Sequence, residues 1–188
     1  MSAIGVRIRD ADLSLTDMRR LATSAEEAGY QSVWLPESMG RDAIAELIAL
    51  VSATKRITVG TGIVPVFGRQ PTLTAAAVAT AAAIAPGRVI LGVGIGHRDS
   101  LVGGHGIEFS RPLAHTREFV EIARQLLRGE SVEHVGDIYT IGRYRVDCTP
   151  SVPVPVYVAA LRPAMLRMAG AVADGVLMNW ATPDRIRE

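Results

Sequence analysis

The sequence predicts an α/β protein built from repeated strand and helix units around a parallel sheet. Runs rich in valine and isoleucine alternate with longer stretches of helical character along the whole chain. The runs are almost continuously apolar, which is typical of strands that helices cover in a parallel sheet. They begin at residues 4, 32, 57 and 89, so successive starts lie 28, 25 and 32 residues apart, the spacing of β/α units.

The first predicted strand covers residues 4–8, and the helix after it covers residues 14–29 with Ser14 as its N-cap. Further strands are expected over residues 32–37, 57–63, 89–96, 155–160 and 175–181, and further helices over residues 42–53, 72–85, 112–128 and 163–173. The first and fourth helices each have one apolar face, made by Met18, Leu21, Ala22 and Ala25 and by Phe119, Ile122, Ala123, Leu126 and Leu127. Thr182 and Pro183 are typical of the start of one more helix.

The connection between the fourth and fifth strands is much longer than the others. It contains an insertion at about residues 97–150, which begins with a loop rich in glycine and histidine over residues 97–110. Residues 131–147 then have the pattern of a β-hairpin around Val135, Gly136 and Asp137. No linker or shift in composition divides the chain, so residues 1–188 are expected to form a single domain.

Composition and charge exclude several classes of function. Hydrophobic residues make up 48% of the 188 residues, which is too many for a disordered chain. The net charge of +1 offers no basic surface for nucleic acid or an anionic membrane, and the longest apolar stretch, residues 73–86, is too short to span a bilayer. Cys148 is the only cysteine and the N-terminus lacks the apolar run of a signal peptide, so a cytoplasmic protein is expected.

Candidate functional residues follow the strands, because ligands of parallel β/α folds bind at the carboxyl ends of the strands. Three successive strands end in small residues, which either leave room for a flat ring system or allow tight packing inside a barrel: Gly60, Gly62, Gly92, Gly94, Gly96, Ala159 and Ala160. The loop after the fifth strand places Arg162 beside the N-terminus of a helix. This arrangement favours the binding of a phosphate group.

Two titratable residues lie where a catalytic acid or base would be useful. His97 directly follows the fourth strand, although a solvated loop histidine would have the same position. Glu37 ends the second strand, either as an acid or base or as the ion-pair partner of Arg41 or Arg69. The four histidines, at residues 97, 105, 115 and 134, lack the spacing of metal ligands on one helix face, so no metal site is expected.

Several blocks of the sequence resemble one known family. The blocks GYQSVWLPES, TKRITVGTGI, APGRVILGVGIGH and VPVYVAALRPAMLRMAG occur in this order and span most of the chain. They resemble the luciferase-like monooxygenase superfamily, and within it the branch that depends on the deazaflavin coenzyme F420 and includes methylenetetrahydromethanopterin reductase. The resemblance implies a (β/α)8 barrel of the TIM type, incomplete with about six β/α units, because a complete barrel usually has about 250 residues.

The resemblance also implies where a cofactor would bind. Its ring would lie at the carboxyl ends of the strands, backed by a third-strand bulge at Gly62 and Ile63 that often contains a non-proline cis peptide bond. His97 has the position where some relatives place a carboxylic acid, and His97 and Glu37 are the expected catalytic residues. The expected cofactor-binding residues are Ser38, Thr61, Gly62, Ile63, Ile95, Gly96, Ala159, Ala160, Leu161 and Arg162, of which the last four would hold the cofactor phosphate.

The implied function is an oxidoreductase that transfers a hydride between a small organic substrate and F420, or a monooxygenase that uses FMN and O2. The alternative is a catalytically silent flavin-binding or dimerisation protein of the same fold. A phosphate-binding isomerase or lyase would need a lysine or paired carboxylates at the strand ends, and the only lysine, Lys55, precedes the third strand. Family members normally extend further, so we expect either a fragment of a longer enzyme or a shortened member, with a homodimer covering the open edges.

Overall fold

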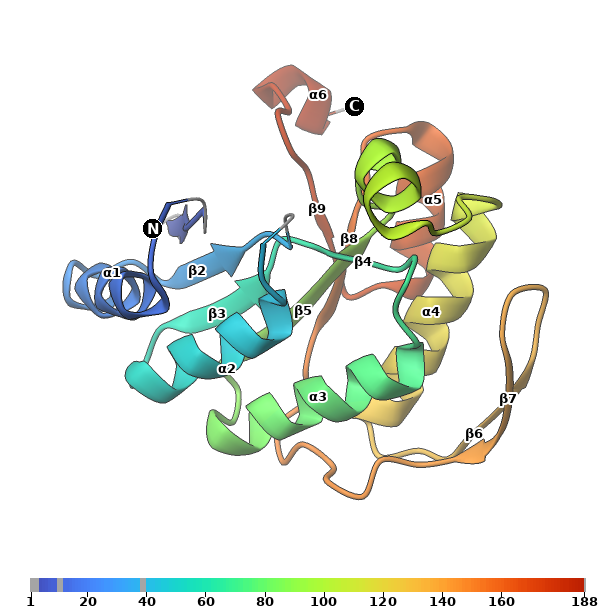
Figure 1. Cartoon of the computed structure of the whole chain (residues 1–188), viewed down its shortest axis with the longest axis horizontal. Helices are drawn as coiled ribbons and strands as arrows, with labels where there is room; N and C mark the ends of the chain where they lie inside the picture. The colour runs from blue at the N-terminus through green and yellow to red at the C-terminus, as the bar shows by residue number, and fades with distance from the viewer. Residues whose placement is uncertain (1–3, 10–11, 38–39, 188) are drawn as a thin grey trace.

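The structure is a computed structural model, and it describes residues 4–9, 12–37 and 40–187. A curled sheet forms its centre, and every pairing in this sheet is parallel, as predicted. Its strands are β1 (Gly5–Arg7), β2 (Ser32–Leu35), β3 (Thr58–Thr61), β4 (Val64–Pro65), β5 (Val89–Gly94), β8 (Val156–Ala159) and β9 (Gly175–Leu177). Their order is β1-β2-β3-β5-β8-β9, with β4 paired to β5. This open, curled sheet is the incomplete TIM-barrel arrangement that the family resemblance implies (Figure 1).

Five helices pack along the outer side of the sheet (Figure 1). They are α1 (Leu15–Glu27), α2 (Ala43–Ala53), α3 (Pro71–Ile84), α4 (Pro112–Leu127) and α5 (Pro163–Val172). Ser14 caps α1 as predicted: its hydroxyl accepts the Asp17 N–H at 3.1 Å, and the Asp17 carboxylate accepts the Ser14 N–H at 3.2 Å. The predicted apolar face of α4 is buried, whereas Leu21 of α1 is 45% exposed because the buried stripe of that helix is narrower than expected.

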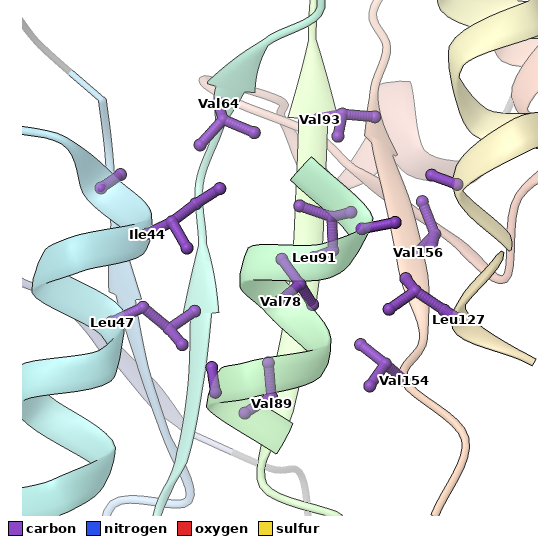
Figure 2. Close-up of a cluster of buried hydrophobic side chains, with 14 of the residues drawn as sticks. Ile44, Leu47, Val64, Val78, Val89, Leu91, Val93, Leu127, Val154 and Val156 are labelled. Atoms are coloured by element: carbon purple, nitrogen blue, oxygen red, sulfur yellow. The ribbon is translucent and has the colours of Figure 1, made fainter. Parts of the chain in front are cut away.

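The hydrophobic core lies between these helices and the sheet. Figure 2 shows side chains of α2, α3 and α4 meeting those of β4, β5 and β8, among them Ile44, Leu47, Val78, Leu127, Val64, Leu91, Val93 and Val156. Alternate residues along a strand point to opposite faces, so the residues between these buried ones face the concave side of the sheet. The concave side therefore remains available for a ligand site.

The third predicted strand, residues 57–63, is interrupted in the structure. Strand β3 ends at Thr61, a cis peptide bond joins Gly62 to Ile63, and the unpredicted short strand β4 follows. The N–H of Gly62 donates to the Leu35 carbonyl at 2.6 Å, and the N–H of Glu37 donates to the Ile63 carbonyl at 3.0 Å. These two bonds attach the turn after β3 to the end of β2.

The insertion contains more regular structure than the sequence indicates. A π-helix, η1 (Ser100–Gly104), lies in the predicted loop, and the predicted hairpin is present as β6 (Val132–Val135) and β7 (Thr140–Tyr144). Glu118 of α4 holds the hairpin turn, because its carboxylate accepts the N–H groups of Asp137, Ile138 and Tyr139 at 3.0–3.2 Å. The hairpin is therefore attached to α4.

The C-terminal part has a shorter strand than predicted. Strand β9 ends at Leu177 and not at residue 181, and α6 (Pro183–Arg187) begins at the predicted proline. In the described sheet, β1 and β9 are the two edge strands, as the incomplete barrel implies. Within residues 4–9, 12–37 and 40–187, no helix has the length and apolar character needed to cross a membrane.

Candidate active site

A cavity of about 1260 Å³ opens at the carboxyl ends of the parallel strands. Segments that follow β2, β3, β5, β8 and β9 line it, which is the location expected for a site in this fold. Ten of the predicted site residues are in its wall: Glu37, Gly62, Ile63, Ile95, Gly96, His97, Ala159, Ala160, Leu161 and Arg162. The structure thus brings together residues from most of the chain, while their individual roles stay predictions.

Two predicted site residues are not in the cavity wall. Ser38 lies outside the described residues. Thr61 is fully buried, and its hydroxyl donates to the Gly92 carbonyl at 2.7 Å and accepts the Gly92 N–H at 2.8 Å. Thr61 therefore joins β3 to β5 and does not line the cavity.

The carboxylate of Glu37 is held by Arg69. Arg69 donates from Nε to Oε1 at 3.0 Å and from Nη2 to Oε2, and the Ala43 N–H donates to Oε2 at 3.1 Å. The other proposed partner, Arg41, pairs with Glu46 at 3.2 Å. Of the two interpretations of Glu37, the geometry favours an ion-pair partner over a free acid or base.

Arg69 also binds a second carboxylate, with its Nη2 2.8 Å from Oδ2 of Asp42. Burial by itself would raise the pKa of Asp42. Hydrogen bonds from the Ala45 and Ile44 N–H groups and from Arg69 outweigh this effect and hold the pKa of Asp42 below its usual value. Arg69 and the first turn of α2 therefore occupy both carboxylates beside the cavity.

His97 is exposed and lines the cavity, three residues after the end of β5. His105, at the end of the π-helix, also lines the cavity, although no sequence pattern pointed to it. The π-helix is anchored below them, since the Leu101 side chain is buried and its N–H donates to the His97 carbonyl at 3.0 Å. Two imidazole groups therefore face one cavity from the same segment.

The small residues of the strands divide into two groups. Gly60 allows packing, because a Cβ atom there would lie 2.6 Å from the ring of Trp34. That indole stacks on Tyr157, with ring centroids 6.2 Å apart, on the concave side of the sheet. Gly62 and Gly96 instead line the cavity. Gly60 therefore serves tight packing inside the sheet, whereas Gly62 and Gly96 lie where they leave room for a ligand.

The start of α5 presents donors to the cavity. Arg162 is the N-cap residue and is exposed, and its side chain makes no capping hydrogen bond. The N–H groups of the first helical turn have no partner inside the helix, and Ala164 and Met165 of that turn line the cavity. Arg162 and these N–H groups have the arrangement that the sequence predicts for a phosphate site, and phosphate binding there stays a prediction.

The cavity wall also contains side chains that were not among the predicted site residues. Arg7 lies on β1, Trp34 on β2, and Arg69 in the segment before α3. Alternation along a strand could have placed Arg7 and Trp34 on the concave side once the buried Val33 and Leu35 were known. Among the residues that the structure describes, no three His, Cys, Asp or Glu side chains form a group able to hold a metal ion.

The fold and this site agree with comparisons with known proteins. The sequence profile of luciferase-like monooxygenases matches residues 2–188. The chain belongs to the luciferase-like monooxygenase family. This member of the family is 32% identical over 173 residues to 5,10-methylenetetrahydromethanopterin reductase of Archaeoglobus fulgidus, which corresponds to 92% of this chain and 52% of the reductase.

A second curated relative is the F420-dependent glucose-6-phosphate dehydrogenase of Amycolatopsis mediterranei, at 32% identity over 190 aligned positions, 94% of this chain and 57% of that protein. Among solved structures, the coenzyme F420-dependent tetrahydromethanopterin reductase of Methanopyrus kandleri superposes with a TM-score of 0.87 at 27% identity, over 97% of this chain and 57% of that chain. This chain spans about half the length of the curated relatives that it matches.

An F420-dependent secondary alcohol dehydrogenase, solved with an F420-acetone adduct, superposes with a TM-score of 0.91 at 26% identity, over 100% of this chain and 61% of that chain. These comparisons confirm the predicted family and fold.

Proposed function

We propose that this family member is an oxidoreductase that uses F420 to transfer a hydride to or from a small organic substrate. The observation that carries the proposal is the cavity at the strand ends. The turn at Gly62 and Ile63 forms one wall, and another wall has hydrogen-bond donors for a phosphate at Arg162 and the start of α5. Relatives at about 32% identity are F420-dependent enzymes, or reduce methylenetetrahydromethanopterin, by their names.

The residues of the cavity fit the cofactor. Arg162 and the first-turn N–H groups of α5 supply hydrogen-bond donors for its phosphate. Ala159 and Ala160 beside them are small and neutral, so they leave room for the phosphate to reach these donors. Gly62 and Ile63 offer backbone and a flat apolar wall for its ring. When bound, F420 would supply the carbon centre that accepts or donates the hydride.

The protein residues would position the substrate and move its proton. His97 can donate or accept a proton on the substrate, because its imidazole lines the cavity and has two ring nitrogens that can serve as donor or acceptor. Glu37 would act differently from the initial expectation, since Arg69 and Ala43 occupy its carboxylate. We assign Glu37 and Arg69 to positioning of the turn at Ile63, whose carbonyl accepts the Glu37 N–H.

Titration with F420 and with FMN tests the proposal. We expect saturable binding of F420 in the micromolar range, followed by its fluorescence, and bleaching of its absorbance with a suitable alcohol or aldehyde in a substrate panel. If the protein binds FMN but not F420, the FMN-dependent monooxygenase replaces the F420-dependent oxidoreductase as the proposed function. Binding of F420 without any hydride exchange would favour the silent binding protein, and binding of neither cofactor would overturn the proposal.

The proposal includes a cytoplasmic homodimer. Leu73 is 68% and Ile84 48% exposed on α3, and we propose this helix as part of the subunit interface. The thiol of Cys148 is free and exposed, which suits a reducing compartment. Light scattering on the purified protein, with Leu73→Glu as the interface variant, would measure the dimer and its loss.

A further inference from the structure

The cavity wall carries more arginines than carboxylates. Its two carboxylates, Glu37 and Asp42, are both bound to Arg69. Two other cations line the wall, Arg7 on β1 and Arg162 before α5, and neither has a hydrogen-bond or ion-pair partner for its guanidinium among the residues that the structure describes. An unpaired arginine in a concave site favours an anionic ligand.

The two unpaired arginines lie far apart in the sheet. Strands β2, β3 and β5 separate β1, which carries Arg7, from β8, which precedes Arg162. The proposed cofactor phosphate uses Arg162 and the start of α5. Because the proposed cofactor phosphate already has Arg162 and the first-turn N–H groups of α5 as its hydrogen-bond donors, Arg7 is left for a second anionic group.

The surroundings of Arg7 form a defined part of the cavity. Val6 packs against the core, so its neighbours Gly5 and Arg7 face the concave side, where both line the cavity. Arg7 pairs in register with Trp34, whose indole is fixed by a hydrogen bond from Nε1 to the Ser32 hydroxyl at 3.0 Å and by its stacking on Tyr157. A cationic group thus stands beside a fixed aromatic surface.

The cavity is larger than a typical pocket for one drug-sized ligand. Ligand pockets for one small molecule are typically about 300–1,000 Å³, and this cavity has about 1260 Å³. We propose that Arg7 and Trp34 form the substrate subsite, and that the substrate has a flat apolar part and an anionic group, carboxylate or phosphate, which Arg7 binds. Its assignment to the substrate rests on the proposed function, since the cofactor occupies the Arg162 side.

Fluorescence of Trp34 tests this subsite without cofactor or turnover. The chain has two tryptophans, and Trp180 is 95% exposed, so Trp180→Phe leaves Trp34 as the only tryptophan at little structural cost. The probes are benzoate, phenyl phosphate and the neutral benzamide. We expect an anionic probe to quench Trp34 saturably and to bind at least tenfold more tightly than benzamide. The tighter of the two anions identifies the carboxylate or the phosphate as the preferred group.

Four variants in the same Trp180→Phe background locate the bound anion. Arg7→Gln should lower the affinity for the anionic probe about tenfold or more and leave the affinity for benzamide unchanged. Arg7→Lys should recover part of the lost affinity. Arg9→Gln is the matched control, because Arg9 lies two residues further along the same segment, is exposed and does not line the cavity. Arg162→Gln should leave the anionic probe unaffected.

The outcomes separate this inference from the proposed function. Equal affinity for benzamide and the anions, an unchanged anion affinity in Arg7→Gln, or a loss that follows Arg162→Gln instead would overturn the subsite. F420 titrated into Arg7→Gln should bind as in the parent protein. Failure of F420 to bind the parent protein contradicts the proposed function, whereas the anion titrations, which contain no F420, still decide where an anion binds.

Discussion

Arg69 binds both oxygens of the Glu37 carboxylate, with Nε 3.0 Å from Oε1 and Nη2 in contact with Oε2. The side chains are only 20% and 17% exposed, and the two residues are 32 positions apart. The pair therefore connects the end of β2 with the segment before α3, on either side of the turn at Ile63. Bidentate contacts of this kind are among the strongest polar contacts in proteins.

Removal of Arg69 alone should harm the protein more than removal of the pair. Arg69→Gln leaves Glu37 and Asp42 without their cation, so we expect a loss of roughly 2–4 kcal/mol in the free energy of unfolding. Adding Glu37→Gln should restore part of this loss, a coupling of about 1–3 kcal/mol in a double-mutant cycle. Urea denaturation measures both values. Additive effects of the two substitutions would show that the contact does not contribute.

The pairing of Glu37 shows what the sequence could predict and what it could not. The pattern of strand ends correctly grouped Glu37, His97 and Arg162, because parallel strands bring their carboxyl ends to one edge. The choice of Arg69 over Arg41 depended on the path of two loops, which no local pattern contains.

The same limit applies elsewhere in the fold. The periodicity of α4 predicted its buried face, since that face depends on one helix alone. The interruption after Thr61, the burial of Thr61 and the position of His105 depend on neighbouring strands and on the π-helix. The resemblance, and not the residue pattern, anticipated the cis peptide bond at Gly62 and Ile63.

Glu118 should stabilise the hairpin in a pH-dependent way. Burial alone would raise the pKa of Glu118, but the Tyr139 N–H, His134 and two further N–H groups outweigh it and hold the pKa below its usual value. A carboxyl with a lowered pKa in the folded state contributes stability above its unfolded pKa, and this is lost as the pH falls through the folded value.

Glu118→Gln should therefore lower the free energy of unfolding by about 1–3 kcal/mol at neutral pH. The difference from the parent protein should shrink between about pH 6 and pH 3. Glu121→Gln, on the exposed side of the same helix, should change stability by less than about 0.5 kcal/mol. Denaturation at a series of pH values measures both, and a difference that stays constant with pH would contradict the account of Glu118.

Gly60 should not tolerate a methyl group. In Gly60→Ala the new Cβ would lie 2.6 Å from the Trp34 ring, so we expect a loss of about 1–3 kcal/mol and a shift of Trp34 emission. Gly170→Ala is the control, because a Cβ there meets no atom within 4 Å and lies in the interior of α5. It should gain roughly 0.5–1 kcal/mol. Equal effects of the two substitutions in thermal unfolding would refute this packing.

The hydroxyl group of Thr61 should contribute more to the free energy of unfolding than its methyl group. Thr61→Val leaves the buried Gly92 N–H and carbonyl without their side-chain partner, at a cost of about 1–3 kcal/mol, whereas Thr61→Ser keeps both hydrogen bonds. Urea denaturation should therefore show the serine variant as the more stable of the two. The reverse order would mean that β3 and β5 do not depend on these bonds.

The central claim, that the cavity holds F420 with its phosphate at Arg162 and the start of α5, has one direct measurement. The affinity of F420 is compared with that of its deazaflavin chromophore lacking the phosphate, in the parent protein and in Arg162→Ala. We expect the parent to prefer F420, and Arg162→Ala to weaken F420 by about 1.5–3 kcal/mol while leaving the phosphate-free chromophore unchanged. Equal loss for both ligands, or an unchanged F420 affinity, would contradict the claim.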